Sequence, residues 1–254
     1  MNKIELIVIS ALLLTFGAWS SATVAAQRID KPTVERQQAE KAFEALIRAK
    51  GGRENLGSVR NMLTQYSDVT ILDSFPCSQW NFGYWLDGLP SLRVYNHDEK
   101  LRVIAGKSGP ERMFHENLED SCWYAQIPFL LETKSYKPVP INVTREKEES
   151  KTHDVLTVVV GSAQLSFVYE PEEMLVTEVR FISGGEVWQK YRFDKYTNIN
   201  GIKMPTLFSV GISANHFVNI KFMPISFQFN VDYDPKIFDP PFVATSPDAW
   251  KRKQ

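Results

Sequence analysis

The chain has 254 residues, in which 29 Lys and Arg nearly balance 30 Asp and Glu to give a net charge of -1. With 43% hydrophobic and 23% charged residues, the composition excludes a disordered chain, a collagen-like repeat and a strongly basic nucleic-acid surface. Two cysteines, Cys77 and Cys122, are too few for a cysteine-dense scaffold or a four-thiolate metal site.

Residues 1–26 have the layout of a secretory signal peptide. Lys3 precedes an apolar stretch from Leu6 to Trp19, and small residues lead to a cleavage site after Ala26. The alternative is a membrane anchor, but an anchor needs about 20 uninterrupted apolar residues. We therefore expect an exported protein with no stable membrane span. Export would permit a disulfide between Cys77 and Cys122, and the alternative is two unpaired thiols that lie too far apart.

The spacing then predicts a helix over residues 32–50. Apolar residues recur at helical intervals, Thr33 can cap the N-terminus, and Gly51 with Gly52 marks the end. Such a helix has an apolar side that another element must cover. Residues 53–59 are expected to add a short turn before the first strand.

From Met62 onward the period changes from helical spacing to two. In the clearest strand, Trp80, Phe82, Tyr84 and Leu86 alternate with Asn81, Gly83 and Trp85. The apolar runs 92–95 and 101–104, separated by a polar turn, predict a hairpin.

A second helical region is predicted from Ser108 to Leu118, because Pro110 stands in a first turn and Met113 and Phe114 fall on one side with Leu118. The pattern is interrupted near Pro128 and resumes from Phe129 to Glu132. Two short helices are therefore expected in the middle of the chain.

The remaining chain is a run of strands joined by connections so short that neighbouring strands must be antiparallel. Val187, Tyr191 and Phe193 are expected to face away from Trp188, Lys190 and Arg192, which predicts one apolar and one wet face. The predicted strands cover 139–145, 155–160, 164–169, 174–182, 186–196, 202–210, 217–222 and 227–233.

About ten strands rarely stay flat, so the sheet is expected to curl around its helices. The predicted fold is α+β: one strongly curved antiparallel sheet forms an open half-barrel over residues 27–242, covered by the N-terminal helix and the mid-chain helical segment. Residues 243–254 are expected to form a tail.

With this layout the chain resembles the LolA/LolB-like superfamily of exported bacterial proteins. The resemblance rests on the helix that ends in residues 45–52, the mid-chain helical insertion, the hairpin formed by residues 191–205, and the closing segment 233–242. It implies a periplasmic location and a cavity between sheet and helices that holds acyl chains or other hydrophobic cargo, as in the family's lipoprotein carriers. No string here aligns with the carriers' cargo-contacting positions, so none of those residues is carried over.

Aromatic residues, 12% of the chain, supply the candidate site. A curved sheet with two helical covers has more apolar face than the helices can bury, so some rings should line an open pocket while others form ordinary core. The predicted ligand-binding residues are Trp80, Phe82, Tyr84, Tyr191 and Phe193.

No catalytic or metal-binding motif is recognisable. Gly106-Lys107-Ser108 lacks the first Gly of a phosphate-binding loop, and His115-Glu116 lacks the second His of a zinc-binding helix. The sequence therefore favours a non-enzymatic carrier of a lipid or a lipoprotein acyl chain, without cofactor or metal. The alternative is a structural or regulatory protein-interaction module of the cell envelope. An enzyme whose site is assembled from distant residues is a third hypothesis.

Overall fold

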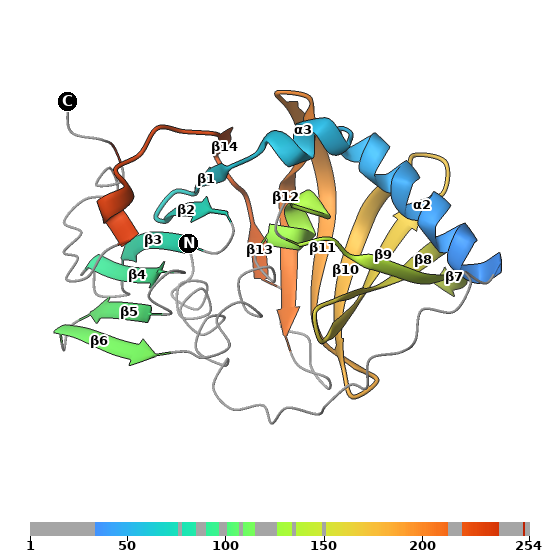
Figure 1. Cartoon of the computed structure of the whole chain (residues 1–254), viewed down its shortest axis with the longest axis horizontal. Coiled ribbons are helices and arrows are strands. Elements are labelled where there is room, and N and C mark those ends of the chain that lie inside the picture. Colours follow the sequence, from blue (N-terminus) through green and yellow to red (C-terminus); the bar gives the residue numbers. More distant parts are fainter. Residues whose placement is uncertain are drawn as a thin grey trace.

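The computed structural model describes residues 34–75, 78–84, 90–96, 101–106, 109–114, 126–133, 136–148, 151–212, 220–238 and 251. Most of it forms two seven-stranded antiparallel sheets with few helices (Figure 1). Sheet A contains, in spatial order, β14 (Ser226–Phe229), β1 (Asn61–Gln65), β2 (Thr70–Ser74), β3 (Ser78–Tyr84), β4 (Pro90–Asn96), β5 (Leu101–Gly106) and β6 (Gly109–Phe114). Sheet B contains β13 (Ile220–Phe222), β12 (Ile202–Ile212), β11 (Glu186–Ile199), β10 (Leu175–Ser183), β9 (Ala163–Glu170), β8 (Lys151–Val160) and β7 (Val139–Glu148).

Several predictions fall on residues outside these ranges. They are the signal peptide over residues 1–26, the disulfide between Cys77 and Cys122, and nearly all of the tail over residues 243–254.

Helix α2 (Val34–Lys50) crosses sheet B (Figure 1), and its bounds confirm the predicted helix. Its buried side carries Ala39, Phe43, Leu46 and Ile47, and the ring of Phe43 stacks on Phe167 of β9 with 6.3 Å between centroids. The backbone N–H groups of Gly51 and Gly52 both donate to the carbonyl of Ile47 and so end the helix. A short helix, α3 (Arg53–Ser58), follows where the short turn was predicted.

The end of α2 is fixed to the hairpin between β11 and β12 by a close approach of two backbones. A Cβ atom on Gly51 would lie 2.5 Å from the carbonyl oxygen of Gly201, and Gly51 has a φ of 148°. Glycine is therefore needed at position 51 both for space and for backbone conformation.

Sheet B is curved, in agreement with the predicted curved sheet (Figure 1). Glu146 of β7 and Arg180 of β10 are separated by two strands, and their long side chains bridge these strands with an ion pair of 2.8 Å. Because Arg180 alternates with the core residue Val179, this pair lies on the face opposite α2.

The two sheets meet where β13 is followed by β14. β13 pairs with β12 of sheet B, whereas β14 pairs with β1 of sheet A. Pro224 lies between the two strands and has no N–H to continue a ladder. The next residue, Ile225, donates its N–H to the carbonyl of Gln65 at 2.7 Å and so joins sheet A. We call the face of sheet B that packs on α2, with the face of sheet A that carries Met62 and Phe227, the inner face.

Among the described residues, sheet A has buried side chains on both of its faces. Its inner face contributes Met62 and Phe227 to the main core beneath α2. Its opposite face forms a second core, which the 3-10 helix η1 (Pro235–Phe238) covers. The members of this second core are Leu63, Leu72, Trp80, Phe82, Leu92, Val94, Ile237 and Phe238.

Two predictions about the elements are wrong. The described residues form fourteen strands in two sheets, where about ten strands in one sheet were predicted. Part of the segment predicted to be helical from Ser108 is instead β6, which pairs with β5 from Gly106 opposite Gly109. Pro110 is tolerated because β6 is the last strand of sheet A among the described residues, where a missing N–H need not break a ladder. The later helix is present, but at residues 126–130.

Candidate functional site

A group of aromatic rings lies on the inner face, where residues 126–130 pack across the junction of the two sheets. Phe129 is at its centre, and its side chain is only 8% exposed. Its ring centroid lies 5.1 Å from that of Phe208, 6.0 Å from Phe193, 6.1 Å from Phe227 and 6.3 Å from Tyr191. We call these five residues the aromatic cluster.

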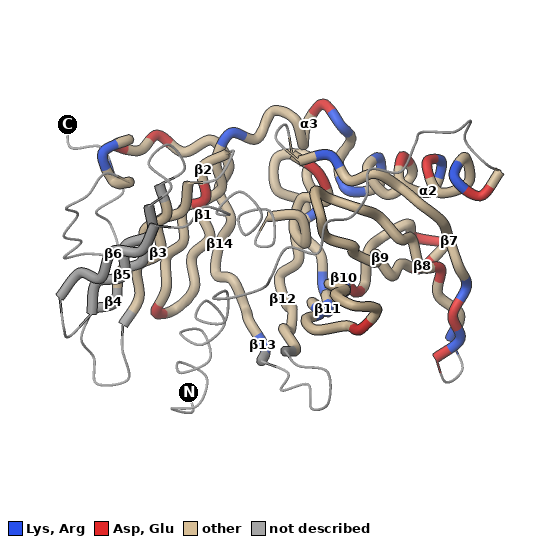
Figure 2. Tube along the Cα trace, turned by 60° about the horizontal axis from the view of Figure 1, so that its bottom comes forward, with Lys and Arg blue, Asp and Glu red and all other residues tan. Residues whose placement is uncertain are grey.

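Strand register explains why the rings converge. Tyr191 and Phe193 are two residues apart on β11 and so share a face, and Phe193 stands opposite Phe208 on β12. Phe227 comes from β14, so the aromatic cluster includes side chains from both sheets. Figure 2 shows that β12 and β14 carry almost no charge, whereas charged residues gather along α2 and around the hairpin of β7 and β8.

The five predicted ligand-binding residues lie in two separate places. Tyr191 and Phe193 belong to the aromatic cluster. Trp80 and Phe82 stack on each other with 5.9 Å between centroids, but they do so in the second core, beneath η1. The side chain of Tyr84 is outside the described residues. The structure therefore brings the members of each pair together and keeps the two pairs apart.

Three members of the aromatic cluster, Phe129, Phe208 and Phe227, were not among the predicted ligand-binding residues. Their positions carried a partial signal, because Phe208 and Phe227 are apolar residues of predicted strands. The signal for Phe129 was weaker, since the turn of helix that holds it packs against strands far away in the chain. Alternation identifies the side of a strand but does not identify the element that covers that side.

Trp188 corrects a second detail of the prediction. It was expected to face away from Tyr191, yet both rings contact Phe181 at 5.8 Å between centroids. The pairing of β10 with β11 shifts register between Phe181 and Ile182. This bulge adds one residue to β11 and turns Trp188 toward the inner side.

Two tyrosine hydroxyl groups are buried beside the aromatic rings. Burial raises the pKa of both Tyr191 and Tyr196 above the ordinary tyrosine value. Tyr196 donates a hydrogen bond of 2.6 Å to the carbonyl of Val176, and Gln189 donates one of 3.3 Å to the hydroxyl of Tyr191. Both tyrosines are therefore neutral hydrogen-bonding groups at physiological pH.

Lys50 is a buried amine at the C-terminal end of α2. Its Nζ lies 5.1 Å from the centroid of the Tyr196 ring. Burial lowers the pKa of Lys50 to about 7, because the ammonium form loses its hydration. The aromatic ring returns part of that stabilisation through its negative face.

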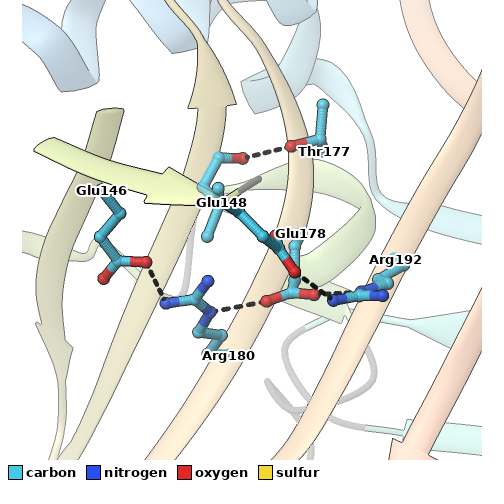
Figure 3. A network of polar contacts seen from close by, with 7 residues as sticks. Glu146, Glu148, Thr177, Glu178, Arg180 and Arg192 are labelled. Carbon is cyan, nitrogen blue, oxygen red and sulfur yellow. Dashed lines mark hydrogen bonds and ion pairs between the residues drawn. The ribbon is translucent and has the colours of Figure 1, made fainter. Parts of the chain in front are cut away.

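A network of charged side chains holds β7, β10 and β11 together on the face opposite α2 (Figure 3). Glu178 accepts hydrogen bonds from Arg180 and Arg192. Arg180 also forms an ion pair with Glu146, and Arg192 forms one with Glu148. Burial alone would raise the pKa of Glu178, but the two arginines outweigh that effect and lower it. The network thus contains three carboxylates and two guanidinium groups, and it links β7, β10 and β11.

Among the described residues, no group of three or more His, Cys, Asp or Glu side chains is placed to hold a metal ion. No helix in the described part of the chain is both long and apolar enough to cross a membrane.

The fold is similar to that of a solved structure. A LolA superfamily protein from Nitrosomonas europaea aligns with 81% of this chain and 98% of its own, with a TM-score of 0.50 and 15% sequence identity. The chain has the fold of the LolA superfamily. The resemblance predicted from the sequence is thus confirmed at the level of the fold.

Two other structures with this general layout are more distant. A DUF1329 family protein from Desulfovibrio piger aligns with 80% of this chain and 97% of its own, with a TM-score of 0.44 and 8% identity. A domain assigned as an outer membrane lipoprotein-sorting protein, from Vibrio parahaemolyticus, aligns with 79% and 97%, with a TM-score of 0.42 and 13% identity. No protein-family profile matches the chain, and no curated protein matches it either.

Proposed function

We propose that the protein is an exported carrier that holds a hydrophobic ligand, a lipid or the acyl chain of a lipoprotein, against the inner face. The aromatic cluster is the observation that carries this proposal. It offers an uncharged surface that spans both sheets, and burial of each methylene of an acyl chain there would contribute about 0.8 kcal/mol. The signal-peptide layout of residues 1–26 and the LolA superfamily fold support a periplasmic location.

In this structure the ring of Phe129 fills the space that the acyl chain would occupy. The ligand must therefore displace residues 126–130. Two features of this segment favour displacement. Leu131, which ends the helical turn, has a φ of 65°, a left-handed conformation that strains a leucine by about 1–3 kcal/mol. The buried side-chain oxygen of Gln126 has no hydrogen-bond partner among the described residues.

The far end of the segment is anchored. Glu132 forms an ion pair of 3.4 Å with Arg53 of α3, and the backbone of Thr133 bonds to Tyr136. Displacement would thus take the form of a rotation about residues 131–133, which keeps the segment attached while Phe129 leaves the inner face. No enzyme chemistry is needed, because binding and release depend on this movement alone.

A comparison of two phenylalanine variants tests the proposal. Phe129→Ala removes the ring that an acyl chain would replace, whereas Phe238→Ala removes a ring from the second core, beneath η1. Each substitution should destabilise the fold by about 3–5 kcal/mol. Titration with a fluorescent fatty acid of twelve carbons should show binding to the wild type. Phe129→Ala should bind several times more tightly, and Phe238→Ala should bind as the wild type does.

Native mass spectrometry of the gently purified protein provides an independent measurement. We expect a lipid to copurify in one-to-one ratio. The proposal would be contradicted by two results together. The wild type would carry no lipid and take up no fluorescent fatty acid, and the Phe129→Ala variant would take up none either.

A second candidate function is a protein-interaction module of the cell envelope. It is favoured by Met223 and Ile225, which flank Pro224 at the junction of the sheets and are 69% and 72% exposed. Two large exposed apolar side chains beside a filled inner face are typical of a contact surface for another protein. Under this alternative, a Met223→Ser and Ile225→Ser double variant would lose a partner from envelope extracts, and the fatty acid would not bind.

A further inference from the structure

Polar side chains are buried on the inner face of sheet A beside Met62 and Phe227, whereas the inner face of sheet B carries aromatic rings. Three of these polar side chains, Thr64, Asp73 and Asn81, are 4%, 4% and 7% exposed. Strand pairing places them on one face, because Asp73 stands between Met62 and Gln79, and Ile71 stands between Thr64 and Asn81. We call Thr64, Asp73, Gln79 and Asn81 the polar patch.

Asp73 is the charged group of the polar patch. One oxygen of its carboxylate accepts a hydrogen bond of 2.7 Å from the side-chain amide of Gln79. Among the described residues, no Lys, Arg or His forms an ion pair with it. Burial raises the pKa of Asp73 to about 6, and the bond from Gln79 opposes that shift only in part. A carboxylate that is out of water and without a cation is costly to the fold.

The polar patch directly adjoins the aromatic cluster. Thr64 on β1 stands opposite Phe227 on β14, and Phe227 belongs to the cluster. Tyr66, just after β1, packs against Phe222 with 6.1 Å between ring centroids. Burial raises the pKa of Tyr66, and the nearby groups that add to this effect are Asp73 and Tyr191. The Tyr66 side chain therefore lies between a residue of the polar patch and a residue of the aromatic cluster.

The segment that the ligand would displace contributes a buried polar atom with no hydrogen-bond partner among the described residues. The side chain of Gln126 is 2% exposed, and its Oε1 has no hydrogen-bond partner among the described residues. Gln126 and Phe129 are three residues apart on a helical turn, so they project on the same side. Phe129 packs on Phe227, and Phe227 stands opposite Thr64 in the pairing of β14 with β1. This side of the helical turn therefore points toward the inner face near the polar patch.

We propose that the polar patch binds the ammonium head group of an amphiphile whose hydrocarbon chain lies on the aromatic cluster. The inference rests on the proposed carrier function and names the chemistry of its ligand. An ammonium group would supply a cation for Asp73, whose carboxylate forms no ion pair among the described residues. Its N–H donors match the carbonyl and hydroxyl oxygens of Gln79, Gln126 and Thr64. A fatty acid would instead bring a second carboxylate beside Asp73, and an alcohol would leave the charge of Asp73 without a partner.

Three ligands with the same twelve-carbon chain test this inference, each used below its micelle concentration. Isothermal titration at pH 7.5 would compare dodecylamine, dodecanol and dodecanoate on the wild type, on Asp73→Asn and on Asp194→Asn. Asp194 is an exposed residue of β11 and serves as the matched control. Dodecylamine should bind the wild type at least about tenfold more tightly than dodecanol, and dodecanoate should bind most weakly.

Asp73→Asn keeps the shape of the side chain, and it should remove the preference by weakening dodecylamine about tenfold while leaving dodecanol unchanged. Asp194→Asn should behave as the wild type. If dodecylamine and dodecanol bind the wild type equally, or if Asp73→Asn keeps the preference, the head-group inference is wrong while the carrier function stands. If none of the three ligands binds, the carrier function fails, and the inference fails with it.

Discussion

Replacement of Asp73 by Asn should stabilise the protein at neutral pH. Burial raises the pKa of the Asp73 carboxyl from its usual 3.8 to about 6, so the folded state holds a proton more tightly than the unfolded chain does. Asp73 therefore favours the native state most below pH 3.8, and this contribution is lost as the pH rises through 6. Relative to low pH, ionisation of Asp73 lowers the free energy of unfolding by about 3 kcal/mol at pH 8 and by about 1.6 kcal/mol at pH 5. The neutral amide of Asn avoids this loss and can still bond to Gln79.

Urea unfolding of the wild type and Asp73→Asn at pH 8 and pH 5 measures this difference. At pH 8 the midpoint of the variant should be higher by about 1 M or more, and the gap should shrink by about half at pH 5. The exposed control Asp194→Asn should show no such narrowing. If Asp73→Asn has the stability of the wild type at both pH values, the carboxylate is hydrated or paired, and both the burial argument and the head-group proposal lose their basis.

Four further substitutions probe other parts of the structure. Burial lowers the pKa of Lys50 to about 7, so the folded state binds the proton less tightly than the unfolded chain, and stability falls as the pH drops from 10.5 to 7. Lys50→Met should therefore raise the melting temperature at pH 6 and raise it much less at pH 9.5. Glu178→Gln leaves two arginines without their shared carboxylate and should lower the free energy of unfolding by about 2–3 kcal/mol, measured by urea titration; an unchanged value would show that the network is solvated. Gly51→Ala forces a Cβ atom against a backbone oxygen and should destabilise the fold by about 2 kcal/mol or more. Gly57→Ala lies inside α3 with open space around it and should stabilise the fold by about 0.5–1 kcal/mol. Equal melting temperatures for the two variants would contradict the close approach at Gly51.

Elements with local signals were predictable from the sequence. The bounds of α2 follow from apolar spacing and from Gly51 with Gly52, which determine where the helix ends. The hairpin of β4 and β5 follows from two apolar runs and a short polar turn. The same argument gives the strands from β7 to β12, because short connections leave antiparallel pairing as the only choice. These features depend on residues close together in the chain.

β6 shows where local signals mislead. Pro110 early in a segment favours a helix, and Met113 with Phe114 can be read at helical or at strand spacing. What decides in favour of a strand is the free edge of β5, which pairs with residues 109–114 along their whole length. A neighbouring strand can satisfy the backbone groups of β6, apart from the missing N–H of Pro110, and the isolated sequence does not reveal that this neighbour is available.

The candidate site was half predicted, and the reason lies in the two faces of β3. Alternation correctly separated Trp80 and Phe82 from Asn81, and these rings were assigned to an open pocket because the curved sheet was expected to have more apolar face than its two helical covers could bury. That assumption fails in sheet A, since η1 returns from the far end of the chain to cover Trp80 and Phe82. The opposite row then becomes the inner face through the pairing of β1 with β14. Polar residues that would be solvated on an ordinary sheet are thereby buried beside the aromatic cluster, which makes them candidates to bind a polar head group.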